Sequence, residues 1–347
     1  MLGDYLKIFF ISGLIAFLAT PLYMLFAKKR RIVDKPSARK VHKKPMPTTG
    51  GIVIWMAFMV GVFFAFKFNP YFMAPFSERF AGIIFGSFVI ILLGLYDDIK
   101  GIYPRGKLYG QIFAAIALMN YGFVIETLTN PFGPGQLSLG ILSVPFTLIW
   151  ILGFTNAVNL SDGLDGLAAG VSGIAAIFIF IAACWHNNYV VAFLTLALAG
   201  SVFGFLPYNF SPAKIFMGDT GSMFLGFILS AIAIEAYQKS TAVVTLLVPI
   251  ITLAVPIIDT ALAIVRRVAR KAKIFSADRE HIHHKLLIER ASHKKVVLSI
   301  YFLTICFGLI ALSMQDLRGI YGALALIIVG IATYRWLKAA GFLKFRL

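Results

Sequence analysis

The chain consists of long apolar runs separated by short polar segments. The runs are close to the ~20 residues that an α-helix needs to cross the hydrocarbon core of a bilayer. Because lipid offers the backbone no hydrogen-bond partner, each run is expected to be helical, and the lack of alternating polarity excludes a β-barrel. The pattern predicts an all-α, polytopic membrane helix bundle of about 11 transmembrane helices, at 5–27, 48–67, 79–96, 108–128, 141–159, 167–185, 189–206, 222–238, 243–265, 297–314 and 319–337.

Composition supports lipid as the main solvent of the protein. Hydrophobic residues make up 59% of the 347 residues and charged residues 14%, with a mean hydropathy of +0.86. Soluble domains contain about 45–50% and about 25%, respectively. These values exclude soluble fold classes. Since no internal repeat or low-complexity linker is visible, residues 1–347 are predicted to form a single integral membrane domain.

The distribution of basic residues predicts the orientation. Of the 32 Lys and Arg residues, 27 fall on one face of the predicted bundle, and cytoplasmic loops are the ones enriched in these residues. This face is therefore expected to be cytoplasmic, with the N-terminus outside and the C-terminus inside. The net charge of +17 is then directed at anionic headgroups rather than nucleic acid. On the opposite face, residues 130–135 are Pro- and Gly-rich and predict turns with a small hairpin.

Carboxylates gather on the basic face, where topology does not require them. Asp97 and Asp98 end a predicted outside-to-inside helix, so the helix dipole and their mutual repulsion cost about 1 kcal/mol or more. Lys100, Arg105, Lys107 or a divalent metal could compensate. A solvated turn with surface ion pairs is the alternative.

A second polar segment follows the predicted helix 141–159. Asn159, Asp162 and Asp165 are spaced three residues apart and would share one face if the helix continued. Gly163 and Gly166 would let a phosphate approach the backbone. The segment predicts a phosphate and metal cradle, with helix capping by one Asp as the alternative.

The loop 207–221 ends in Gly218-Asp219-Thr220-Gly221 and opens the next predicted helix. An Asp at this point suits an N-cap. The same free N–H groups also form an anion site, where a carboxylate-held Mg²⁺ would clamp a pyrophosphate. Both interpretations remain open from this segment.

Two further groups of ionisable residues are notable. Asp259 lies inside the predicted helix 243–265 and is expected to be buried near the inner interface, facing either substrate or another side chain. The loop 266–296 is rich in basic residues, which favours headgroup contacts, and holds four of the six histidines. Phosphate or ring contacts to a nucleotide suit these histidines better than a zinc site, because no cysteine and no i, i+4 histidine pair is present.

Together these segments resemble the polyprenyl-phosphate N-acetylhexosamine-1-phosphate transferase family. The resemblance runs from 34–42 through Thr48-Thr49-Gly50-Gly51 to the histidine loop. One branch of the family, the phospho-N-acetylmuramoyl-pentapeptide transferases, carries three consecutive histidines and a following acidic residue. Here the segment reads His281-Ile282-His283-His284, which is similar to the bacterial undecaprenyl-phosphate N-acetylglucosamine-1-phosphate transferases.

The resemblance implies roles for individual residues. Asp97, Asp98 and Lys107 match the catalytic positions that handle the lipid phosphate, and Asn159 and Asp219 match those that hold Mg²⁺, with Mn²⁺ as a substitute. Lys100 stands one position earlier than the lysine that some members carry, so Lys107 is preferred over it. The substrate-binding positions implied are Asn156, Asp162, Asp165, Asn209, Arg279, His281, His283 and His284.

The implied reaction is transfer of N-acetylglucosamine 1-phosphate from UDP-GlcNAc to undecaprenyl phosphate with release of UMP, the first membrane step of a cell-envelope polysaccharide pathway. It implies a multi-pass protein of the bacterial cytoplasmic membrane, compatible with a homodimer, whose active-site face is formed by the loops 28–47, 97–107, 160–166, 207–221 and 266–296. Other sugars, MurNAc-pentapeptide or GalNAc, are alternatives. A lipid or ion transporter is the alternative from another class, but transporters place ionisable groups near the midplane of repeated helices.

Overall fold

The protein is a bundle of long helices, seen in a computed structural model that describes residues 1–34, 45–129, 135–239, 244–269 and 292–314, together with 331 and 335. The helices of the described part are α1 (Leu2–Lys29), α2 (Gly51–Phe68), α3 (Pro70–Met73), η1 (Ala74–Phe76), α4 (Ser77–Lys100), α5 (Pro104–Asn120), η2 (Gly140–Leu142), α6 (Ser143–Ser161), α7 (Leu167–Trp185), α8 (Tyr189–Asn209), α9 (Gly218–Lys239), α10 (Val244–Thr252), α11 (Ala254–Ala269) and α13 (His293–Ser313). The predicted helical class is confirmed.

Two short antiparallel ladders complete the described structure. β1 (Val33–Asp34) pairs with β2 (Met46–Pro47) beside the end of α1. β3 (Thr127–Thr129) pairs with β4 (Gln136–Ser138). The small hairpin predicted around 130–135 is therefore present in its two strands, while 130–134 lie outside the described residues.

Eight helical segments of the described part are long and apolar enough to cross a membrane, against eleven predicted runs. The eight are Leu2–Lys29, Gly51–Phe68, Pro70–Lys100, Gly140–Ser161, Leu167–Trp185, Tyr189–Asn209, Gly218–Gln238 and His293–Ser313. Of the other three predicted runs, 319–337 lies outside the described residues apart from 331 and 335. The remaining two differ from prediction for local reasons.

The first difference is the predicted helix 108–128, which ends early. α5 stops at Asn120 because Gly122 takes a left-handed conformation, with φ +87°, and its N–H bonds to the Met119 carbonyl at 2.9 Å. A glycine in this conformation just after the last turn is a common helix terminator. The chain then turns back through the buried Phe123 towards β3.

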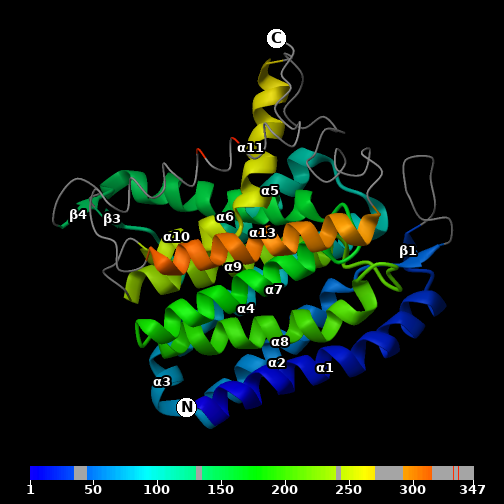
Figure 1. The fold of residues 1–347 in the computed structure, drawn as a ribbon, viewed down its shortest axis with the longest axis horizontal. Coiled ribbons are helices and arrows are strands. Elements are labelled where there is room, and N and C mark those ends of the chain that lie inside the picture. Colours follow the sequence, from blue (N-terminus) through cyan, green and yellow to red (C-terminus); the bar gives the residue numbers. More distant parts are fainter. Residues whose placement is uncertain are drawn as a thin grey trace.

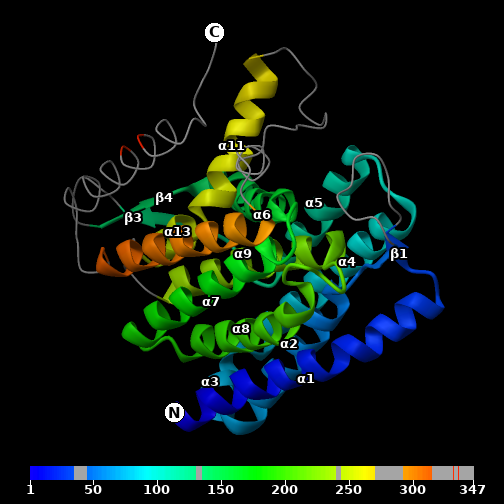
Figure 2. The same ribbon diagram turned by 45° about the vertical axis from the view of Figure 1, so that its right-hand side comes forward.

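The second difference is the predicted helix 243–265, which is two helices. α10 ends at Thr252, and α11 leaves it at Leu253 to run crosswise to the bundle (Figures 1 and 2). Pro256 has no N–H to donate to the carbonyl of residue 252, and its ring crowds that carbonyl, so the ladder is interrupted. The prediction of one continuous helix was wrong, although Asp259 is buried as expected, with 4% exposed.

α9 is the central helix of the bundle (Figure 1), and every residue from 220 to 237 is buried. α4 and α6 pack against its two sides, with further contacts from α2, α7 and α10. α1 lies at the edge, against α8 and α2, and only 22% of its apolar window is buried. Without a hydrophobic force between helices in lipid, such packing depends on close contact and hydrogen bonds.

Small residues bring α4 and α9 into backbone contact. A Cβ atom built on Gly94 of α4 would lie 2.4 Å from the Cα atom of Thr220, and one on Gly51 of α2 would lie 2.1 Å from the Cα atom of Gly221. No side chain fits at either position. The glycines therefore set how closely α4 and α2 approach the first turn of α9.

We expect Gly94→Ala to destabilise the protein, because its methyl group must push α4 away from α9. Overpacking of this kind costs about 1–3 kcal/mol. The midpoint of thermal unfolding in detergent measures the loss. Gly153→Ala on α6 is the matched control, because a Cβ atom there meets nothing within 4 Å, and equal midpoints for the two variants would contradict the packing argument.

Candidate active site

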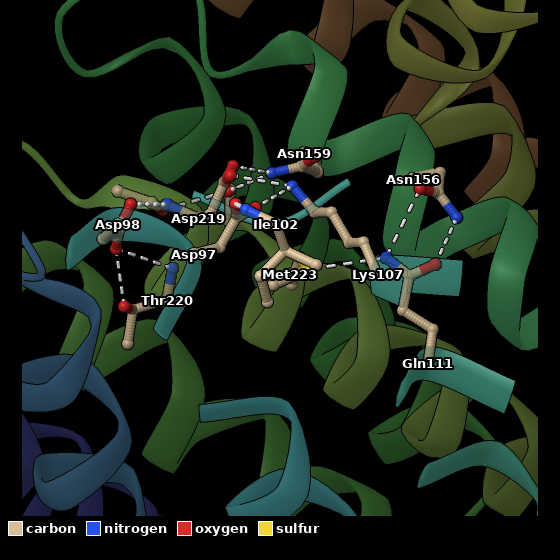
Figure 3. A network of polar contacts seen from close by, with 12 residues as sticks. Asp97, Asp98, Ile102, Lys107, Gln111, Asn156, Asn159, Asp219, Thr220 and Met223 are labelled. Atoms are coloured by element: carbon tan, nitrogen blue, oxygen red, sulfur yellow. Dashed lines mark hydrogen bonds and ion pairs between the residues drawn. The ribbon is translucent and has the colours of Figure 1, made fainter. Parts of the chain in front are cut away.

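Four helix ends meet at one end of the bundle and carry the polar residues singled out by the sequence (Figure 3). They are the last turn of α4, the first turn of α5, the last turn of α6 and the first turn of α9. α4 and α5 are joined by the short segment 101–103, which keeps the first two ends adjacent. Residues more than 100 positions apart in sequence are thereby brought into hydrogen-bond contact.

Asp98 binds the start of α9. Its Oδ1 accepts the Asp219 N–H at 2.9 Å, and its Oδ2 accepts the Thr220 N–H at 3.1 Å and the Thr220 hydroxyl at 2.6 Å. The first N–H groups of a helix lack intrahelical partners and carry its positive dipole end, so they favour a carboxylate. The N–H groups at this helix start therefore bind an anionic group, the Asp98 carboxylate of α4.

Lys107 forms ion pairs with two carboxylates from different helices. Its Nζ lies 2.9 Å from Asp97 Oδ2 and 2.7 Å from Asp219 Oδ2. The exposed fractions of the side chains are 11% for Asp97, 17% for Lys107 and 35% for Asp219, so the cluster opens mainly at Asp219. Asp97 is fixed further by the Ile102 N–H, which donates to its Oδ1 at 2.7 Å.

The compensation expected for the paired aspartates is thus divided. Lys107 supplies the cation for Asp97, whereas Asp98 is bound by backbone N–H groups and a hydroxyl. Lys100 is exposed and lies over the Tyr96 ring, 5.3 Å from its centre. Arg105 is also exposed.

Asn159 completes the polar group around Asp219. Its Nδ2 donates to Asp219 Oδ1 and, at 2.8 Å, to the hydroxyl of Ser222. Together with Lys107, it engages both oxygens of the Asp219 carboxylate. The two residues expected to share a metal ion are therefore in direct contact.

The turn after α6 departs from the predicted shared face. α6 ends at Ser161, and residues 162–166 form a turn that closes on Gly166, whose φ of +78° begins α7. The expectation that Asn159, Asp162 and Asp165 lie on one helical face was wrong, because the helix stops between the first and the second. Asp165 instead holds the loop before α9, accepting the Ala213 N–H at 3.0 Å.

Asp162 lies within electrostatic range of the site although it is not on the predicted face. Burial, and then the negative charges of Asp219, Asp98 and Asp165, hold the pKa of the Asp162 carboxyl well above its ordinary value. Removal of a carboxylate from water and placement beside like charges both disfavour its charged form.

Asn209 and Asn156 have structural partners. Asn209 is 2% exposed, and its Nδ2 donates to the Ile215 carbonyl at 3.0 Å, which ties the end of α8 to the loop before α9. Asn156 lies one turn below Asn159 on α6, where it bonds to Gln111 of α5. Their predicted role in substrate binding stays a prediction.

Several residues of the site have contacts that the sequence did not predict. Thr220 and Ser222, in the segment that opens α9, bind Asp98 and Asn159. The Gly50 and Gly51 N–H groups donate to the carbonyls of 216 and 217, each at 3.0 Å, so the Thr-Thr-Gly-Gly motif braces the loop before α9. Thr49, fully buried with φ +65°, contacts the Tyr23 hydroxyl at 2.5 Å.

Four of the predicted substrate-binding residues, Arg279, His281, His283 and His284, lie outside the described residues. They belong to the loop 266–296, of which 270–291 are not described. Their roles in substrate binding therefore stay predictions from the sequence.

The chemistry of the cluster suits a hard divalent cation. Its side chains provide carboxylate and amide oxygens, the ligands that Mg²⁺ prefers. In the described part of the chain no three His, Cys, Asp or Glu side chains lie close enough to hold a metal alone. Mg²⁺ commonly takes only one or two carboxylates and completes its shell with substrate phosphates and water, so the residues present fit that mode.

A helix bundle with several apolar helices long enough to span a membrane and a cluster of charged side chains at its helix ends has the features of a membrane enzyme. Comparison with known proteins identifies its family. Residues 80–237 match the family model described as glycosyl transferase family 4. The chain belongs to this family of transferases, and the resemblance drawn from its motifs is confirmed.

The relatives are polyprenyl-phosphate sugar-phosphate transferases. The chain is 39% identical over 308 residues to the "Probable undecaprenyl-phosphate N-acetylglucosaminyl 1-phosphate transferase" of Bacillus subtilis, covering 89% of this chain and 84% of the relative. It is 35% identical to the decaprenyl-phosphate N-acetylglucosaminephosphotransferase of Mycobacterium leprae, covering 93% and 87%. It is 36% identical to a phospho-N-acetylmuramoyl-pentapeptide-transferase of Listeria monocytogenes, covering 67% and 75%.

We expect Asp98→Asn to lower the stability of the protein, because an amide would turn a donor towards the N–H groups of α9. Loss of a charge-assisted bond at a helix start costs about 2 kcal/mol or more. Thermal unfolding in detergent measures this. Asp4→Asn is the control, since within the described residues the Asp4 carboxylate forms ion pairs with its near neighbours Lys7 and the N-terminus, and a similar fall in that variant would contradict the anchoring role of Asp98.

Proposed function

We propose that this protein transfers N-acetylglucosamine 1-phosphate from UDP-GlcNAc to undecaprenyl phosphate and releases UMP. The observation that carries the proposal is the convergence of Asp97, Lys107, Asn159 and Asp219 at one end of the bundle. The Bacillus and Mycobacterium relatives, whose names specify a polyprenyl phosphate and N-acetylglucosamine, support this choice of substrates.

In this reaction an oxygen of the lipid phosphate attacks the phosphorus that bears the sugar. A new P–O bond forms, and the P–O bond to the uridine monophosphate breaks, so UMP leaves with the bridging oxygen and its negative charge. Two anions must meet, and the largest demand is stabilisation of charge on the departing phosphate. No oxidant or further co-reactant is needed.

Lys107 is the cation best placed to meet this demand. Its ammonium group already lies between Asp97 and Asp219, within 3 Å of each. An incoming phosphate would therefore replace one carboxylate as the partner of a Lys107 side chain that is already held in place. Such preorganised charge acts without reorganisation at the moment of reaction. Asp97, held by the Ile102 N–H, would hold Lys107 in place and could accept a proton from a monoanionic lipid phosphate.

The surroundings of Asp98 favour direct displacement over a covalent intermediate. Both of its oxygens accept hydrogen bonds from Asp219 and Thr220. A nucleophilic attack by Asp98 would require these bonds to break and would release the start of α9. Asp98 is better suited to hold α9, and thereby Asp219, in position.

Asp219 and Asn159 are proposed to hold Mg²⁺, or Mn²⁺ in its place, with the phosphates of the nucleotide completing its shell. Bound there, the ion would neutralise charge on the pyrophosphate. The Asp162 carboxyl interacts electrostatically with Asp219, one of these two residues. The sugar nucleotide would be bound by the residues matched in the family, including Arg279 and the histidines of the loop 266–296.

The proposed setting is the bacterial cytoplasmic membrane, with the site on the cytoplasmic side. The end of the bundle that carries the cluster also carries the Lys28–Arg31 segment at the end of α1 and Lys294 at the start of α13, which lies over the Phe210 ring, as expected for an inner face. A homodimer is compatible with this arrangement.

A different UDP-N-acetylhexosamine is the second candidate substrate. The Listeria relatives are named for transfer of phospho-N-acetylmuramoyl-pentapeptide. The His281-Ile282-His283-His284 sequence favours N-acetylglucosamine, because it differs from the three consecutive histidines of that branch.

Purified protein in detergent is expected to release UMP from UDP-GlcNAc only when undecaprenyl phosphate and Mg²⁺ are both present. Removal of Mg²⁺ with a chelator should stop release, and its return should restore it. Parallel reactions with UDP-GalNAc and UDP-MurNAc-pentapeptide measure sugar choice. Release of UMP without lipid phosphate would argue against the proposed transfer. Faster turnover of another UDP-sugar would show that this sugar, and not N-acetylglucosamine, is the preferred substrate.

Lys107→Met is expected to lower kcat by about 100-fold or more, the usual effect of removing a group that stabilises transition-state charge. Lys100→Met is the matched control, because Lys100 is exposed at the nearby end of α4 and lies over Tyr96 instead of a carboxylate. It should retain kcat within about twofold, as expected for a side chain that makes only an exposed cation–π contact. Equal losses in the two variants would remove Lys107 from its proposed role.

A further inference from the structure

A second polar layer lies one helical turn below the site, on the same three helices (Figure 3). Gln111 follows Lys107 by four residues on α5, Asn156 precedes Asn159 by three on α6, and Met223 follows Asp219 by four on α9. Residues three or four apart on a helix lie above one another. The lower layer therefore repeats the helix positions of the upper one.

Gln111 lies at the centre of this layer. Its Oε1 accepts a hydrogen bond from Asn156 Nδ2 at 2.9 Å, and its Nε2 donates to Asn156 Oδ1 at 3.4 Å and to the Met223 sulfur at 3.3 Å. Asn156 Nδ2 also donates to the Leu152 carbonyl of its own helix at 2.8 Å. With 1% of Gln111 exposed, water cannot replace these partners.

The amide pair joins two helices whose main packing partners differ. α5 packs mainly against α4, and α6 mainly against α9. A buried amide that loses its partner costs about 1–3 kcal/mol. The reciprocal pair therefore opposes any change in the separation of α5 and α6 at this level.

That separation decides whether the upper layer can form. Lys107 reaches Asp219 Oδ2 from α5, and Asn159 reaches Asp219 Oδ1 from α6. If α5 and α6 moved apart, only one of the two could remain on the same carboxylate. Misplacement by about 1 Å at a reacting centre can cost 100-fold in rate.

We infer that Gln111 and Asn156 are positioning residues for the transfer reaction, acting through Lys107 and Asn159 by fixing the distance between α5 and α6. The inference rests on the proposed function for its effect on turnover. It gives Asn156 a role inside the protein, in place of the substrate contact implied by the family resemblance.

The test uses a length-conserving exchange of the two amides. Gln111→Asn and Asn156→Gln each alter the span of the pair by one methylene, and the double variant restores the total. Each single variant is expected to lower kcat by about tenfold with KM for UDP-GlcNAc within about twofold, since displacement of catalytic groups impairs the transition state more than substrate binding. The double variant should recover most of kcat.

Gln238→Met is the control for Gln111→Met. Gln238 is exposed and also makes several amide hydrogen bonds, donating to the carbonyls of Gly122 and Val124 and accepting from Arg79, at the far end of α9. If Gln238→Met lowered kcat as much as Gln111→Met at the same loss of thermal stability, the effect would be general destabilisation. That result, or a double variant no better than the worse single variant, would overturn the inference.

A second readout needs no substrate and separates this inference from the proposed function. The rate at which a small amine-reactive reagent acylates Lys107, followed by peptide mass spectrometry, reports whether its ion pairs protect it. We expect Gln111→Met to raise this rate several-fold and Gln238→Met to leave it unchanged. A wild-type protein without turnover would end the proposed function only, whereas unchanged labelling in Gln111→Met would overturn the positioning role.

Discussion

The contact between the Asp98 carboxylate and the first turn of α9 is the interaction on which the site depends. Asp98 stands at the negative end of the α4 dipole, an unfavourable place for a carboxylate. The unpaired N–H groups of Asp219 and Thr220 provide the compensation that solvent cannot supply at this depth. This contact thereby provides hydrogen-bond partners for both the Asp98 carboxylate and the first N–H groups of α9. It also joins two helix ends that are distant in sequence.

Close approach of the backbones makes this contact possible. Gly94 on α4, Gly51 on α2 and Gly218 before Asp219 leave no room for a Cβ atom against their neighbours. At Gly218, with φ +73°, the space that a side chain would fill is taken by Asp98 itself. In lipid, where helices gain little from burying apolar surface against each other, such contacts and buried hydrogen bonds supply the specificity of packing.

Much of the site could be anticipated from the sequence because its residues interrupt apolar runs, where ionisable groups are costly. Asp97, Asp98, Lys107, Asn159 and Asp219 were all found in this way and do converge. Gln111 was not found, because a single amide inside an apolar helix has no distinctive pattern. Its spacing of four residues after Lys107 was the available signal, and it gains meaning only beside Asn156 and Met223.

The amino-acid sequence by itself determined the helical class, the membrane as solvent, the family and most residues of the polar cluster, because length, apolarity and motif are properties of the chain. Only the tertiary structure decided which partner each polar group takes. A cation was expected to compensate the Asp97–Asp98 pair, and Lys107 contacts Asp97 while Asp98 is bound by helix N–H groups. The carboxylates after Asn159 leave its face because α6 ends at Ser161. These outcomes depend on how segments far apart in the chain meet, which local spacing does not encode.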